Sequence, residues 1–151
     1  MKILIMYKSN DQLGHLVSEL DVKLNQDELN AIDDCEELFH VGGDVFATHW
    51  GDEYAPKIWE GMEWDLVLFH TSFLNYGERL TEQLKGLAAQ QIADAGIEPS
   101  SKVIPFSEGY SLWGQKLLKI ATAYGRGCIS ERKARKKIKK IRKKYNLYLS
   151  S

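Results

Sequence analysis

Short runs of consecutive apolar residues predict the β-strands of this chain. They cover residues 2–7, 38–41, 66–70 and 102–106, and a shorter run at 127–130 indicates a fifth strand. The runs are apolar throughout rather than alternating between apolar and polar residues. This pattern is typical of strands that are buried on both faces of a parallel sheet.

Segments of helical periodicity lie between these runs and predict amphipathic helices. They cover residues 9–20, 54–62, 77–96, 109–125 and 131–149. The second strand is expected to end at Gly42 and Gly43, and a loop is expected at 47–54. Strands that alternate with helices favour an α/β fold. We therefore expect a single three-layer α/β/α domain with a mainly parallel, doubly wound, five-stranded sheet.

The charge of the chain is divided unevenly along its length. Residues 131–151 hold 10 of the 20 Lys and Arg residues and one acid, whereas residues 1–130 hold the other 10 and 20 acids. The two parts therefore carry net charges of +9 and −10 within a total of −1. This asymmetry predicts an α/β body at 1–130 and a basic amphipathic helix at 131–151, either packed on the body or extending from it.

The basic helix has a narrow apolar stripe formed by Ala134, Ile138, Ile141 and Tyr145. Its other faces are almost wholly basic, so it is suited to nucleic-acid phosphates, a membrane surface or an acidic protein. Alternatively, the stripe docks on the sheet and the cations are only solvated. The residues expected to contact a partner are Arg132, Lys136, Lys137, Lys139, Lys140 and Lys143.

Length and composition exclude several classes of protein. A chain of 151 residues fits one domain, and it has no apolar run of the roughly 18 residues needed to cross a membrane. The first residues do not form a secretory signal, so a cytoplasmic location is expected. Two cysteines without close spacing predict neither a disulfide framework nor a zinc site, and no cofactor is expected.

Polar residues follow three of the predicted strands. In a doubly wound sheet, ligands bind in the crevice outside the carboxyl ends of the strands. The residues predicted to meet in this crevice are Asp11, His70, Thr71, Ser72, Ser107 and Glu108. They suit a polar small molecule, or a metal held by Asp11, His70 and Glu108; alternatively, they only cap the ends of strands and helices.

The sequence "WDLVLFHTSFLNYGERLTEQLKG" at 64–86 resembles the third strand and following helix of response-regulator receiver domains. "KVIPFS" is similar to their fourth strand, which ends on a Ser or Thr, here Ser107. The resemblance implies a receiver-like fold over most of the chain. However, His70 occupies the position of the phosphorylated Asp, and Ser9 and Asn10 replace the acidic pair that holds magnesium. The resemblance therefore implies a degenerate receiver without phosphotransfer.

The segment "DLVLFHTSFL" is also similar to the amino-terminal half of some two-domain glycosyltransferases, although 151 residues leave no room for their second domain. The favoured function is a non-enzymatic, regulatory, receiver-like module that binds a protein partner or forms a homodimer. A nucleic-acid-associated protein that uses the basic helix is one alternative. A small-molecule or nucleotide-binding domain related to the glycosyltransferase half is the other.

Overall fold

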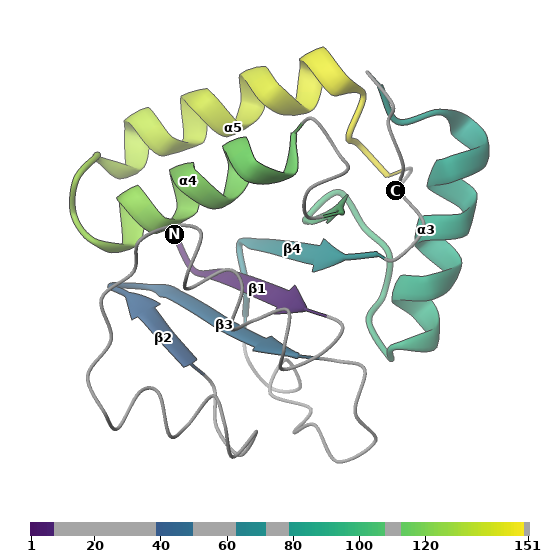
Figure 1. Cartoon of the computed structure of the whole chain (residues 1–151), viewed down its shortest axis with the longest axis horizontal. Coiled ribbons are helices and arrows are strands. Elements are labelled where there is room, and N and C mark those ends of the chain that lie inside the picture. Colours follow the sequence, from purple (N-terminus) through teal and green to yellow (C-terminus); the bar gives the residue numbers. More distant parts are fainter. Residues whose placement is uncertain (8–38, 50–62, 72–78, 108–112, 150–151) are drawn as a thin grey trace.

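The computed structural model describes five stretches of the chain, which are residues 1–7, 39–49, 63–71, 79–107 and 113–149. Within them the protein is an α/β structure with a five-stranded, mostly parallel sheet and three helices (Figure 1). The predicted fold class is confirmed at this level. The predicted helices at 9–20 and 54–62 lie outside the described residues.

The sheet has the strand order β2-β3-β1-β4-β5. The strands are β1 (Ile3–Tyr7), β2 (Phe39–Gly42), β3 (Val45–His49), β4 (Leu66–His70) and β5 (Val103–Phe106). The central strand β1 pairs in parallel with β3 and β4, and β5 pairs in parallel with β4. Only β2 runs antiparallel, against β3.

The central position of β1 explains its continuous apolar sequence. All five of its residues are fully buried, and every residue of β4 and β5 is buried as well. A strand with neighbours on both sides and packing on both faces leaves no position for a solvated side chain. The apolar runs at 2–7, 66–70 and 102–106 are therefore confirmed as strands.

The predicted fifth strand at 127–130 is wrong, because these residues form the turn between two helices. Gly127 has a φ of 78°, and its N–H donates to the Tyr124 carbonyl. The Cys128 N–H donates to the Ala123 carbonyl, which completes a Schellman cap. Two residues later, the Ser130 hydroxyl accepts a hydrogen bond from the Lys133 N–H and caps the next helix. The two caps leave no residues for a strand.

The actual additional strand is β3, part of which was predicted as a loop at 47–54. It forms a hairpin with β2, with Gly43 in the turn at a φ of 50°. A glycine tolerates this left-handed conformation without steric cost. The run at 38–41 is therefore an antiparallel edge strand, and β3 occupies the place beside β1.

Helix α4 (Gly114–Gly125) crosses the sheet. At its start, the buried Trp113 indole N–H donates to the Pro105 carbonyl in β5, at 2.8 Å. At its end, Gly125 packs directly on Gly42 at the β2–β3 turn. Twelve residues span about 18 Å, close to the width of a five-stranded sheet at about 4.8 Å per strand. Because it reaches from β5 to the hairpin, α4 covers the core between them.

Helix α5 (Glu131–Tyr145) returns beside α4 (Figure 1). It buries Ala134, Ile138 and Tyr145, so the predicted apolar stripe faces the body. The helix passes the amino ends of β1 and β5. Glu131 contacts the Met1 nitrogen ahead of β1, and the Arg142 guanidinium donates to the Ser101 carbonyl ahead of β5.

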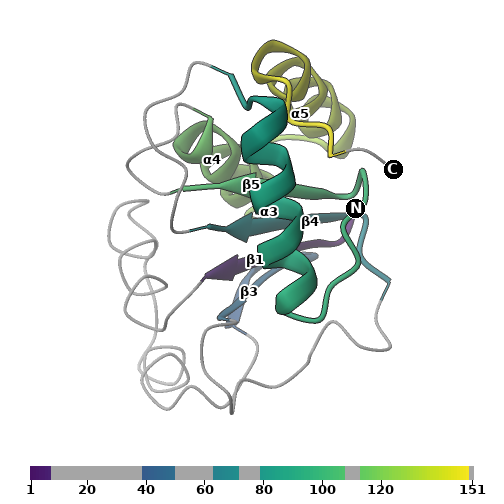
Figure 2. The same cartoon turned by 90° about the vertical axis from the view of Figure 1, so that its right-hand side faces the viewer.

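Helix α3 (Glu82–Asp94) stands apart from α4 and meets the chain where α5 ends (Figure 2). Asn146 ends α5 in the left-handed conformation, with a φ of 60°. Its amide donates to the Leu80 carbonyl at 3.0 Å and accepts from Lys85 at 3.2 Å. In addition, the Leu80 N–H donates to the Tyr145 carbonyl at 2.8 Å. These bonds fix the end of α5 to the start of α3.

The contact between α4 and the hairpin predicts a strong effect of a single methyl group. A Cβ at Gly125 would lie 2.8 Å from the Gly42 carbonyl oxygen and 3.0 Å from the Val45 Cβ. We expect Gly125→Ala to lower the free energy of unfolding by about 1–3 kcal/mol, because the backbones must separate. Urea denaturation followed by circular dichroism measures this change.

The matched control is Gly86→Ala in α3, where a Cβ meets nothing within 4 Å. This substitution should raise the free energy of unfolding by about 0.5–1 kcal/mol, since alanine favours the helix. Equal effects of the two substitutions would contradict the close packing of α4 on the hairpin.

Candidate functional site

The carboxyl ends of β1, β4 and β5 bring together a cluster of aromatic rings. Parallel pairing sets His70 opposite Phe106. The Tyr7 ring stacks on the His70 ring, with 5.7 Å between the centroids, and the Phe106 ring meets His70 edge-on at 5.4 Å. All three side chains are buried. His70 is therefore packed among rings at the end of its strand.

Two more residues of the predicted crevice are buried beside this cluster. The Thr71 hydroxyl donates to the Phe106 carbonyl at 3.3 Å, and its N–H donates to the same oxygen at 2.8 Å. Ser107 is 3% exposed. The structure thus brings His70, Thr71 and Ser107 to one edge of the sheet. The other three predicted crevice residues, Asp11, Ser72 and Glu108, lie outside the described residues.

The described ranges contain no group of three or more His, Cys, Asp or Glu side chains that could hold a metal ion. The metal set considered from the sequence joins His70 to Asp11 and Glu108, both beyond those ranges. At the carboxyl edge of the sheet, the predicted crevice residues that the structure describes are the buried imidazole of His70 and the buried hydroxyls of Thr71 and Ser107.

The basic residues of α5 have a very different environment. All six that were predicted to contact a partner are exposed, namely Arg132, Lys136, Lys137, Lys139, Lys140 and Lys143. Among the described residues, the one ion pair that an α5 cation forms is Arg135 with Glu131, at 3.7 Å. Arg132 and Lys143 are separated by roughly 16 Å along the helix axis. The helix therefore presents a continuous row of positive charge, called here the outer basic face.

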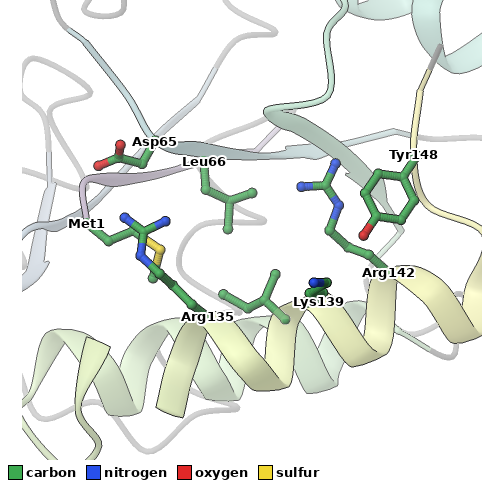
Figure 3. A pocket seen from close by; sticks show the side chains of 8 residues that line it. Met1, Asp65, Leu66, Arg135, Lys139, Arg142 and Tyr148 are labelled. Atoms are coloured by element: carbon green, nitrogen blue, oxygen red, sulfur yellow. The ribbon is translucent and has the colours of Figure 1, made fainter. Parts of the chain in front are cut away.

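A cavity of about 250 Å³ borders this row at Lys139 and lies between α5 and the amino ends of β1 and β4 (Figure 3). Its apolar walls come from both the sheet and the helix, and its charged groups come mainly from α5. The lining residues are Met1, Asp65, Leu66, Arg135, Ile138, Lys139, Arg142 and Tyr148. We call it the amino-edge cavity.

Arg142 is the most enclosed cation of the cavity. One terminal nitrogen donates to the Ser101 carbonyl, and the guanidinium carbon lies 4.3 Å from the centroid of the Tyr148 ring. Its Nε is buried and has no hydrogen-bond partner among the described residues. Burial lowers the pKa of this guanidinium below its ordinary value, because water no longer solvates the charge fully.

Asp65 is the only acid among the described residues that line the cavity. Its carboxylate accepts a hydrogen bond from the Lys2 N–H at 2.7 Å. This bond, helped by the positive charges of the Met1 amine, Arg135 and Lys102, lowers the pKa of Asp65 despite an opposing desolvation effect. Asp65 is therefore ionised at neutral pH.

This cavity was not predicted from the sequence. Lys139 was expected as an outer contact residue, but Asp65, Arg135, Arg142 and Tyr148 were not singled out. The sequence contains one indication of this cationic flank. Arg135, Lys139 and Arg142 follow the helical spacing i, i+4, i+7 next to the apolar stripe. The sheet edge that closes the cavity depends on tertiary packing.

No protein-family model, curated protein or solved structure matches this chain. None of the helices within the described residues is long and apolar enough to cross a membrane.

The lowered pKa of Asp65 predicts a change in stability at acidic pH. A carboxylate with a depressed folded-state pKa stabilises the fold above its ordinary pKa of 3.8, and this contribution is lost as the pH falls through the folded-state value. We expect Asp65→Asn to be less stable than the unchanged protein at neutral pH. The difference should narrow as the pH falls below 3.8, as measured by urea denaturation at a series of pH values.

Glu98→Gln is the control, because Glu98 is exposed and has no hydrogen bond or ion pair among the described residues. A difference between Asp65→Asn and the unchanged protein that does not vary with pH would contradict the charge-dependent role of Asp65.

Proposed function

We propose that this protein is a non-enzymatic binding module that attaches to nucleic acid through phosphate contacts of α5. The observation that supports this function most directly is the outer basic face. Its cations are exposed and form no ion pairs among the described residues. A cationic row of this kind binds polyanions because binding releases the counterions that were condensed on them.

The docking of α5 makes the outer basic face a fixed surface. Ala134, Ile138 and Tyr145 are buried, and Asn146 ties the end of the helix to Leu80. The cations are therefore held together by packing on the far side of the helix, even though like charges on neighbouring turns repel one another. A preformed surface binds its partner without first ordering the helix.

The composition of the outer basic face favours phosphates over a protein partner. Five of its six residues are lysines, and lysine is depleted in the buried centres of protein interfaces, where aromatic residues and arginine are enriched. The large hydrophobic side chains exposed among the described residues are Leu87 in α3 and Tyr148 beyond α5, neither of them on this face. Lysines act as point charges that match phosphates without further shape complementarity.

A regulatory, receiver-like module that binds a protein partner is the second candidate function. We propose it from the parallel order β3-β1-β4-β5, which is compatible with a flavodoxin-like sheet to which β2 is added. The buried His70 at the end of β4, where the resemblance expects an acid, supports a version without phosphotransfer. In this case the outer basic face would meet an acidic protein surface.

The nucleic-acid function is tested by removing charge from the outer basic face. The variant carries Lys136→Gln, Lys137→Gln, Lys140→Gln and Lys143→Gln. We expect the unchanged protein to bind double-stranded DNA of arbitrary sequence with an affinity that falls steeply with salt concentration. The variant should bind more weakly, and the negative slope of log K against log salt should become shallower by about 0.9 for each phosphate that the variant no longer neutralises. Fluorescence anisotropy across a salt series measures both.

The control variant removes the same charge elsewhere on the surface. It carries Lys2→Gln, Lys102→Gln, Lys119→Gln and Arg126→Gln, all at exposed positions outside α5. Its salt slope should match that of the unchanged protein. If both variants lose binding equally, DNA is attracted by the general charge of the surface and the assignment to α5 is wrong. If no DNA is bound and a stable homodimer persists in the α5 variant, the protein-interaction candidate is favoured instead.

A further inference from the structure

The amino-edge cavity holds more positive than negative charge. Arg135, Lys139 and Arg142 line it, whereas Asp65 is the only acid among its described lining residues. Of the three cations, Arg135 pairs with Glu131. Lys139 and Arg142 have no ion pair within the described ranges. The cavity therefore carries cationic charge that the described part of the fold does not neutralise.

The partial burial of Arg142 makes this imbalance significant. A guanidinium that leaves water loses solvation, and it regains that free energy only through hydrogen bonds and opposite charge. Here Arg142 has one carbonyl acceptor and an aromatic face, while its Nε lacks an acceptor among the described residues. An anion in the cavity would supply what is missing.

The charges are arranged unequally along the cavity. Figure 3 shows Asp65 at the end near Met1 and Arg135, and Arg142 beside Tyr148 at the other end, with Leu66 between them. Since Asp65 is ionised and repels an anion, the favourable position lies at the end formed by Lys139 and Arg142. Leu66 and Ile138 provide apolar wall next to it.

The size of the cavity limits the ligand. Cavities for drug-sized ligands measure about 300–1,000 Å³, and this one measures about 250 Å³. It suits a phosphoryl group and a small organic carrier. A phosphomonoester carries a charge of about −1.5 to −2 at neutral pH, which matches two otherwise unneutralised cations. Its oxygens accept hydrogen bonds readily from a guanidinium.

We propose that the amino-edge cavity binds a small phosphomonoester, with its phosphoryl group held by Lys139 and Arg142 and its carrier against Leu66 and Ile138. This site does not rest on the proposed function, because Lys139 is the one lining residue that it shares with the outer basic face, whereas Arg142, Leu66 and Ile138 lie outside that face. It also differs from the usual ligand position in α/β sheets, which is the carboxyl edge.

Titration of the full chain with ribose 5-phosphate, followed by calorimetry and phosphorus NMR, tests the site. We expect saturable binding to the unchanged protein. Lys139→Gln should weaken it about three- to tenfold, the range for a partly screened charged hydrogen bond. Lys139 makes no contact on which folding depends among the described residues, so this variant is expected to fold normally.

Lys140→Gln is the matched control, because it removes the same charge from the next position of the helix, outside the cavity lining. It should change the affinity less than about twofold. Equal losses in the two variants would show that the helix attracts phosphate only through its general charge, and would overturn the assignment of the cavity. Absence of saturable binding would overturn it as well.

Inorganic phosphate is the second probe, and it separates the ester from the bare anion. Tighter binding of ribose 5-phosphate than of inorganic phosphate supports a carrier that contacts the apolar wall. Equal or tighter binding of inorganic phosphate would refute the ester. Because these titrations contain no nucleic acid, their failure leaves the DNA-binding result of the outer basic face unaffected.

Discussion

The burial of one narrow apolar stripe on α5 determines the arrangement of charge in this protein. The helix carries ten cationic side chains, and Ala134, Ile138 and Tyr145 occupy the only face that avoids them. Once this stripe is buried beside α4, the direction of every other side chain of the helix follows from its 3.6-residue period. The side of the helix away from the stripe then forms the outer basic face, and the flank that carries Arg135, Lys139 and Arg142 encloses the amino-edge cavity.

The path of α4 makes this docking possible. The helix reaches from Pro105 to the β2–β3 turn, where two glycines allow the backbones to touch. The Schellman cap at Gly127 and the hydroxyl cap at Ser130 then reverse the chain within a few residues. As a result, α5 starts beside Met1 and runs along the strand ends. The charged surfaces of α5 thus depend on the backbone packing of α4 on the β2–β3 turn.

The sequence predicted the parts of the fold that follow from local pattern. Strands β1, β4 and β5 could be located because burial on both faces demands unbroken apolar runs. Helix α5 could be located because its stripe and caps are contained in its own residues. Parallel pairing also explains why His70, Thr71 and Ser107 lie at one edge, whereas the structure describes none of Asp11, Ser72 and Glu108.

The incorrect predictions concern short sequences that are compatible with two different local structures. The glycines at 42 and 43 can end a strand or turn a hairpin, and only the pairing with Val45 decides between them. The short run at 127–130 is apolar enough for a strand, but its residues form the cap at the end of α4 and the cap at the start of α5. The amino-edge cavity could not be predicted, since Asp65 and Leu66 approach α5 only after the sheet and helices have assembled.

The central place of β1 has a consequence for the order of folding. This strand is made first, yet Ile3 pairs with Val45 and Leu66, which are translated much later. Its five apolar residues have no sheet neighbours while the chain emerges, and contacts of such long sequence separation form slowly. The nascent protein therefore keeps this hydrophobic strand without its two sheet neighbours until β3 and then β4 have also left the ribosome. During that interval, early chaperone contact at residues 3–7 would guard it against aggregation.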